Sequence, residues 1–317
     1  MWYHYLVPVN IYKITRVFIV LAAVVFIAGG CKPRHIQRRE IISFEPIFGI
    51  HYIEVHRRLQ NGLIFNKDGY QLEPQWELTF LKNDSTRIYS PVKKAFINFP
   101  LSRGYDSIFN TARTWYKVRK MNTDSLLLEI LKFTGDSINT SGNKVFMTFY
   151  SDKHIKALHT DTAALRRPTS RDTAYVKTLV AKSQADINQA FAARQTVQII
   201  STNPNITVEK FKAEATMLNH FDTSDDYFSP EFYIVDTNAF RDFSYSFTAY
   251  VDAKGQLAFG VPLVGFLESG YEKKFIKDCK LLINGYMKYY FKIKPGSTLG
   301  MVHASRISLH VKGRKRN

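Results

Sequence analysis

The chain has 317 residues, of which 45% are hydrophobic and 14% aromatic, and it carries a formal net charge of +17. This composition excludes wholesale disorder, and the length allows one large domain or two ordinary ones. The positive charge suits anionic partners such as lipid headgroups or acidic polymers. The sequence carries no nucleic-acid-binding motif, so we expect no nucleic acid among its partners.

Residues 1–30 have the features of a signal peptide, namely a short basic region followed by the apolar run Val17–Ala28. This run is shorter than the roughly 20 apolar residues that a membrane-spanning helix needs. It ends in Ala28-Gly29-Gly30-Cys31, which resembles the bacterial lipobox, with Ala28 in place of the usual Leu. The resemblance implies cleavage between Gly30 and Cys31 and attachment of a diacylglyceryl group, which carries fatty acyl chains such as palmitate, to the Cys31 thiol.

The residues that follow Cys31 indicate where such a lipoprotein is anchored. Lys32 follows the cysteine directly, and residues 32–39 contain no acidic side chain. By resemblance to lipoprotein sorting in Gram-negative bacteria, this implies the periplasmic face of the outer membrane, where a basic tether lies beside anionic headgroups. Two other interpretations stay open: an uncleaved signal anchor, and an incidental cysteine behind an ordinary signal peptide.

After a tether at residues 31–43, residues 44–157 have the alternating apolar pattern of a β-rich domain. Strands are predicted at residues 75–81, 87–89, 95–99, 126–133 and 144–150. One helix is also predicted, because Asp106 suits a helix cap and apolar residues follow it at helical spacing. These apolar residues are Phe109, Ala112, Trp115 and Tyr116.

Residues 158–171 are polar and are predicted to link this domain to a second one at residues 172–317. A helix is predicted from Asp172 to Arg194, because its apolar residues form one stripe. Strands are predicted next, at residues 197–201 and 208–217. The expected fold is therefore α+β, with a β-rich N-terminal domain followed by an α+β domain.

Residues 243–311 have the most regular pattern and predict the order β-β-α-β. Alternating residues from Phe243 to Val251 predict a strand, and Gly255 is expected to take a positive φ in the hairpin turn that follows. The partner strand is predicted at residues 256–264. A helix is predicted at residues 271–290, with Cys279 on its buried face. Ile307, Leu309 and Val311 predict the closing strand.

This C-terminal unit resembles the C-terminal domain of TonB-like energy transducers. The resemblance rests on the hairpin Tyr250–Gly255, the helix, and the turn Pro295–Gly300. The chain departs from that family at Ile293, where the family usually has Trp, and it lacks the family's long Pro-rich segment. The resemblance implies binding of an extended partner segment at a strand edge, for which we single out Phe243, Tyr245, Phe247 and Tyr250. A convergent ββαβ unit without this role is the alternative.

Few side chains form a pattern that points to catalysis or to metal binding. His51 and His56, like His154 and His159, are five residues apart and do not share one strand face, so no metal site is predicted. His303 and His310 are expected in loops or on a solvated face. We find no catalytic motif and expect no cofactor.

The sequence as a whole therefore predicts a lipid-anchored envelope protein that acts by binding rather than by catalysis. The expected partners are the membrane, through the lipid on Cys31, and an envelope protein or an anionic polymer. A periplasmic enzyme with dispersed catalytic residues is the first alternative, and it predicts a pocket that joins an acidic residue to a histidine. A structural assembly factor is the second, and it predicts a large exposed apolar patch.

Overall fold

The structure is a computed structural model, and it describes residues 41–90, 93–134, 137–139, 144–214 and 225–315. The predicted signal peptide, most of the tether, and with them Gly30 and Cys31, lie outside the described residues. The chain is strand-rich, which confirms the β-rich character predicted for its first part. Residues 41–317 form one unit that contains two large and separate hydrophobic clusters.

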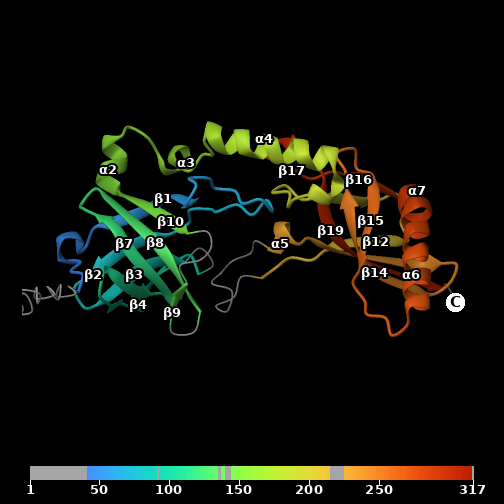
Figure 1. The fold of residues 1–317 in the computed structure, drawn as a ribbon, viewed down its shortest axis with the longest axis horizontal. Helices are drawn as coiled ribbons and strands as arrows, with labels where there is room; N and C mark the ends of the chain where they lie inside the picture. The colour runs from blue at the N-terminus through green and yellow to red at the C-terminus, as the bar shows by residue number, and fades with distance from the viewer. Residues whose placement is uncertain (1–40, 91–92, 135–136, 140–143, 215–224, 316–317) are drawn as a thin grey trace, which may run out of the picture. The chain divides into compact units, whose positions relative to one another are not determined.

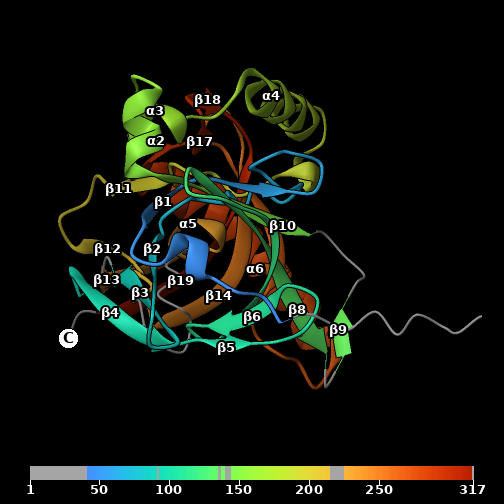
Figure 2. The same ribbon diagram turned by 90° about the vertical axis from the view of Figure 1, so that its left-hand side faces the viewer.

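Ten strands of the described residues form a first sheet, with the order β4-β3-β2-β1-β10-β8-β7-β6-β5 and with β9 paired to β8. All of their pairings are antiparallel, and β1 joins β2 to β10 in the middle of the sheet (Figures 1 and 2). The strands are β1 (His51–Leu59), β2 (Glu77–Leu81), β3 (Ser85–Ser90), β4 (Ala95–Pro100), β5 (Ser102–Arg103), β6 (Ile108–Thr111), β7 (Thr114–Met121), β8 (Ser125–Thr134), β9 (Ser137–Asn139) and β10 (Val145–Ser151).

The first sheet buries one face because apolar and polar residues alternate along its strands. In β2, Leu78 and Phe80 are buried, while Thr79 between them is half-exposed. The short helix η1 (Glu45–Ile47) follows Phe44, whose ring stacks on that of Phe80 at 4.2 Å between centroids. The first core therefore forms around aromatic side chains contributed by several strands.

The helix predicted behind Asp106 is wrong, because residues 108–121 form the antiparallel strands β6 and β7. Ala112 and Arg113 both take positive φ, of 47° and 61°, and make the tight turn between the two strands. Phe109 and Tyr116 are buried on one face, each opposite the other in the register. Their spacing fits a helix as well as a hairpin, and the two-residue turn decides between them.

After β10, the last strand of the first sheet along the chain, the described residues form several helices. These are α2 (Asp152–Ala157), α3 (Thr162–Leu165), α4 (Ser170–Ala185), η2 (Ile187–Gln189) and, further on, α5 (Asp225–Phe228). α3 forms inside the segment that we predicted to be a linker. α4 begins with a capping box formed by Thr169 and Asp172 and ends at Ala185, nine residues before the predicted end. It ends there because Asp186 is extended and its side chain caps η2 instead.

The second sheet has the order β12-β13-β19-β14-β15 in the described residues. Its strands are β12 (Ile206–Lys210), β13 (Glu231–Ala239), β14 (Phe243–Val251), β15 (Leu257–Pro262) and β19 (Ser305–Lys315). β13 runs parallel to β19, and the other pairings are antiparallel. Two small pairs join β11 (Gln198–Ser201) to β16 (Phe291–Lys294), and β17 (Ser297–Thr298) to β18 (Met301–Val302).

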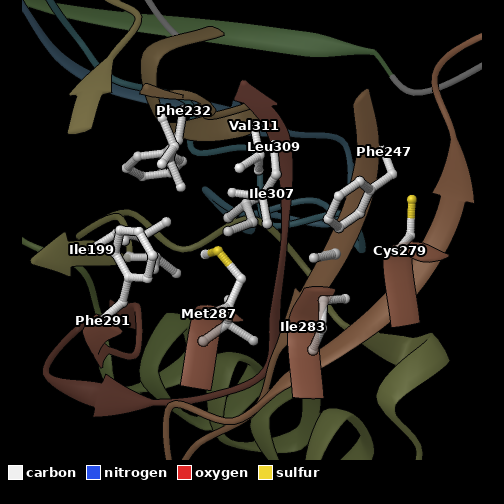
Figure 3. Close-up of a cluster of buried hydrophobic side chains, with 14 of the residues drawn as sticks. Ile199, Phe232, Phe247, Cys279, Ile283, Met287, Phe291, Ile307, Leu309 and Val311 are labelled. Carbon is white, nitrogen blue, oxygen red and sulfur yellow. The ribbon is translucent and has the colours of Figure 1, made fainter. Parts of the chain in front are cut away.

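One face of the second sheet packs against a long helical segment (Figure 1). This segment consists of α6 (Ser269–Leu281), a π-helical stretch η3 (Leu282–Met287) and α7 (Lys288–Tyr290). Figure 3 shows Cys279, Ile283 and Met287 on the helical segment among apolar side chains of the strands, such as Phe247 and Leu309. Cys279 is fully buried, which confirms its predicted place on the apolar face of the helix.

The elements of the predicted β-β-α-β order occur at residues 243–311, but within a larger sheet. Gly255 takes the predicted positive φ, at 80°, in the hairpin between β14 and β15. The closing strand β19 lies between β13 and β14, so its parallel partner comes from earlier in the chain. β16, β17 and β18 intervene between the helix and β19. The unit is therefore completed by β12 and β13, which the sequence pattern did not connect to it.

Candidate binding face on the second sheet

The four residues predicted to bind a partner all lie on β14, but in different surroundings. Phe247 is fully buried in the core, so the structure contradicts its assignment to a binding surface. Phe243 and Tyr245 are half-buried on the same face, and Tyr250 is half-buried on the opposite one. β14 has β19 along one side, and β15 along Phe247–Val251 on the other. We predicted that β14 captures a partner strand, but along Phe247–Val251 both of its edges are already paired.

The face of the second sheet opposite the helix carries a row of basic and polar side chains on β19. Successive side chains of a strand point to opposite faces, and Ile307, Leu309 and Val311 point into the core. The residues that alternate with them along β19 point the other way. These are Arg306, Ser308, His310, Lys312 and Arg314, which together we call the basic face.

Hydroxyl and aromatic groups of the neighbouring strands flank the basic face. On β14, Ser244 and Ser246 lie opposite Lys312 and His310, and Tyr250 lies opposite Arg306. Ser246 Oγ and His310 Nδ1 are 2.9 Å apart and share a hydrogen bond. On β13, Tyr233 stacks on the ring of His310, with 4.7 Å between the ring centroids. The imidazole is therefore held between a hydroxyl group and an aromatic ring.

Positive charge gathers along β19, and the acidic Glu231 lies beside it on β13. Arg306, Lys312 and Arg314 are exposed. At about 3.3 Å per residue they extend over about 26 Å of strand. Glu231 lies next to β19, with its carboxylate 3.9 Å from His310 Nε2, and accepts a hydrogen bond from the Tyr233 hydroxyl at 3.2 Å. Burial and the Glu231 carboxylate raise the pKa of Tyr233, so this phenol stays a hydrogen-bond donor at neutral pH.

The two C-terminal histidines differ in their surroundings. His310 is partly exposed on the basic face, as predicted. His303 is fully buried, so its predicted place on a solvated face is wrong. Its ring stacks on Phe191 at 3.7 Å, Nε2 bonds to Thr298 Oγ1 and Nδ1 to the Ala304 carbonyl. Burial lowers the pKa of His303, so this imidazole is neutral and acts as a packing element.

The remaining histidine candidates do not come together. His51 Nδ1 lies 2.8 Å from Asp152, and its Nε2 lies 3.3 Å from Glu77. His56 lies beyond an irregularity in β1. His154 lies on α2 and makes an edge-to-face contact with the ring of Tyr150, with 4.8 Å between the ring centroids. Among the residues that the structure describes, no group of three or more His, Cys, Asp or Glu side chains is placed to hold a metal ion.

The residue pattern predicted the strand that carries the basic face but not the face itself. Ile307, Leu309 and Val311 predicted the closing strand, and the residues between them alternate with that apolar row. The alternation alone places Arg306, His310, Lys312 and Arg314 on one surface. This alternation was the available signal, but only the structure shows that Arg306, Lys312 and Arg314 stay exposed among the described residues.

Comparison with known proteins gives no family assignment. No protein-family model matches the chain, and no curated protein matches it. Of the helices in the described part of the chain, none is both long and apolar enough to cross a membrane.

Proposed function

We propose that this chain is a lipid-anchored protein of the bacterial envelope that binds an anionic polymer through the basic face. The observation that supports the proposal best is the row of Arg306, Lys312 and Arg314 on one exposed surface of β19. The ligand is a linear polysaccharide with repeated carboxylate, phosphate or sulfate groups. The α+β layout with a TonB-like unit at residues 243–311 belongs to the same proposal, as the scaffold that presents this surface.

The geometry of the basic face fits an extended ligand better than a compact one. Its cations lie along a strand rather than in a pocket, so a polymer gains from meeting all of them at once. Guanidinium groups bind carboxylate and phosphate oxygens in pairs. The hydroxyls of Ser244 and Ser246 add donors and acceptors beside the charges. Because these side chains are exposed, dissolved salt screens their attraction for the anionic polymer. The Debye length is about 10 Å at 0.1 M ionic strength.

The anchor is the second half of the proposal, and it rests on the residues around Cys31. An apolar run followed by Gly29-Gly30-Cys31 supports signal cleavage and lipidation. Lys32 in place of Asp supports delivery to the outer membrane and retention on its periplasmic face. Lipid anchoring would hold the chain at a surface where its partner polymer is concentrated, which raises the effective concentration of binding sites.

A second candidate function is hydrolysis by Ser246. His310 lies within hydrogen-bonding distance of the Ser246 hydroxyl, which is the arrangement of a nucleophile and its general base. The third member, Glu231, is 3.9 Å from the imidazole, beyond hydrogen-bonding distance. Ser246 also lies on a regular strand with a half-exposed side chain. Labelling of Ser246 by a fluorophosphonate would favour the enzyme, and absence of labelling would favour the binding protein.

The binding half is tested by the affinity of the purified full-length chain for dextran sulfate, with uncharged dextran as the reference polymer. In one variant Arg306, Lys312 and Arg314 become Ala. In the matched control, Lys273, Lys277 and Lys280, which are exposed on α6, become Ala and remove the same charge. We expect the first variant to lose at least about tenfold in affinity and the control less than about twofold. Equal losses would mean that net charge alone governs binding and would refute the basic face.

The anchor is tested by intact mass and membrane fractionation of the wild type and Cys31→Ser in a Gram-negative host. A mature chain that begins at Cys31 with diacyl or triacyl mass, lost together with membrane attachment in the variant, is the expected result. An unprocessed, membrane-bound chain in both cases would refute the lipid anchor.

A further inference from the structure

A groove on the second sheet is lined by residues that the proposed polymer binding does not use. It has a volume of about 590 Å³ and lies between the end of β13, the start of β14 and the helical segment. The volume falls within the range of small-molecule sites, about 300–1,000 Å³. Phe243 and Tyr245, two of the residues singled out from the sequence, contribute to its wall.

Aromatic rings make up much of the wall of the groove. The Phe243 ring lies 5.9 Å from that of Tyr245 and 6.0 Å from that of Tyr286, measured between centroids. Tyr290 continues this row at 5.2 Å from Tyr286. Phe240 also lines the groove and is 96% exposed, which is far more than a side chain with a purely structural role needs. The groove therefore offers flat apolar surfaces to a ligand.

Polar groups of both charges lie between these rings. The Tyr286 hydroxyl donates to Asp236 Oδ2 at 2.9 Å, and the Tyr245 hydroxyl donates to Asp278 Oδ2 at 3.3 Å. Burial, reinforced by these carboxylates, raises the pKa of both tyrosines, so their hydroxyls stay protonated at neutral pH. Arg241 also lines the groove and supplies donors. The carboxylate and phenol oxygens retain free acceptor positions for a ligand.

The π-helical stretch η3 places several of these residues in one line. Asp278, Leu282, Tyr286 and Tyr290 are four residues apart and all line the groove. In an α-helix of 3.6 residues per turn, each step of four drifts by about 40° around the axis. The wider turns of a π-helix reduce that drift, and such stretches are frequent at functional sites. The irregular helix is therefore what aligns the polar and aromatic groups.

We propose that this groove binds an uncharged oligosaccharide. An anion would be repelled by Asp236 and Asp278, and a cation by Arg241 and by lysines in the adjoining hollow of α6. An apolar ligand would leave the buried Asp236 and its neighbours without water and without new partners. A sugar suits both the polar groups and the aromatic rings of the groove. Its hydroxyls donate and accept hydrogen bonds, and its C–H faces stack on aromatic rings.

The test is saturation-transfer NMR on the full-length chain with uncharged hexasaccharides of glucose, mannose and N-acetylglucosamine. We expect at least one of them to bind, with the strongest transfer to the C–H protons of one ring face. In Phe240→Ala and Arg241→Ala, we expect its affinity to fall at least about tenfold, which corresponds to about 1.4 kcal/mol of binding free energy. Tyr271→Ala is the control, because Tyr271 is also an exposed aromatic residue, 65% exposed, but does not line the groove.

Two results would overturn the proposal. If none of the hexasaccharides binds at millimolar concentration, the groove does not take uncharged saccharides, and a protein segment becomes the better occupant. If a sugar binds but Tyr271→Ala weakens its binding as much as Phe240→Ala, the sugar binds elsewhere. Dextran sulfate binding should persist in Phe240→Ala, and hexasaccharide binding should persist in the variant that lacks the three cations of the basic face. Failure at one site is therefore distinguishable from failure at the other.

Discussion

Replacing Asp172 by Asn removes the charge from a fully buried carboxylate that joins three segments of the chain. Its Oδ2 accepts hydrogen bonds from Thr169 N at 2.8 Å and Thr169 Oγ1 at 2.6 Å, and Arg58 lies 3.2 Å away. Its Oδ1 accepts from Ile64 N at 3.0 Å. Every one of these neighbours is a donor, so the amide NH₂ of Asn must face at least one of them.

The expected loss of stability in Asp172→Asn follows from these contacts. Removing one partner of a buried ion pair costs about 3–5 kcal/mol of the free energy of unfolding. Arg58 is one-fifth exposed and also donates to the Gly62 carbonyl, so it stays partly satisfied when the charge is lost. We therefore expect the free energy of unfolding to fall by about 3 kcal/mol, the lower end of that range. At about 2–3 °C per kcal/mol for a chain of this size, the Tm falls by about 6–9 °C.

The measurement is urea and thermal unfolding followed by far-UV circular dichroism, with Asp161→Asn as the control. Asp161 caps α3 from an exposed position, and Asn is an equally good cap, so the control should change stability by less than about 0.5 kcal/mol. Equal effects of the two substitutions, or a loss below about 1 kcal/mol for Asp172→Asn, would refute the role given to the buried carboxylate.

The same carboxylate has a pH signature. Burial alone would raise the pKa of Asp172, but the hydrogen bonds from Thr169 and Ile64 and the charge of Arg58 lower it overall. A carboxylate with a lowered pKa in the folded state stabilises the fold above its unfolded pKa of about 3.9. That stabilisation is lost as the pH falls through the folded pKa. The stability difference between the wild type and Asp172→Asn should therefore be constant above about pH 5 and shrink below about pH 4.

Three further predictions concern the second sheet. Burial raises the pKa of the Cys279 thiol to about 12, so in a Cys31→Ser chain it should react with iodoacetamide at pH 8 only after unfolding, as mass spectrometry would show. Met287→Ala should lower the free energy of unfolding by about 2–5 kcal/mol in urea titrations, because Met287 is fully buried. A Cβ at Gly313 would overlap the Phe243 ring, so Gly313→Ala should destabilise the fold by about 1–3 kcal/mol and weaken hexasaccharide binding in the NMR assay.

The parts of the fold that could be predicted are those in which one residue pattern excludes the alternatives. The alternation in β14 predicted both of its ends, and Gly255 marked the turn that follows. The pattern around Phe109 and Tyr116 suited a helix and a hairpin equally, and the deciding feature was positive φ at Ala112 and Arg113. Neither residue type favours that conformation, so no residue pattern predicted the turn.

The candidate sites were less accessible from the sequence, because they depend on which strands become neighbours. The pairing of β19 with β13 brings Tyr233 onto His310, which lies 77 positions further along the chain (310 − 233 = 77). The groove depends on a π-helical stretch, and no local residue pattern predicts one. Phe243 and Tyr245 are half-buried on β14, and their role in binding stays a prediction, whereas Phe247 shares their face and is fully buried.

The most direct test of the central claim is to locate the bound polymer on the lipidated chain by amine labelling and mass spectrometry. Lys312 lies on the basic face, whereas Lys273, Lys277 and Lys280 are exposed on α6. Polymer binding along β19 predicts that saturating dextran sulfate lowers the labelling of Lys312 severalfold and leaves the three α6 lysines unchanged. Protection of the α6 lysines with Lys312 still fully reactive would contradict the account, because the polymer would then follow surface charge rather than the basic face.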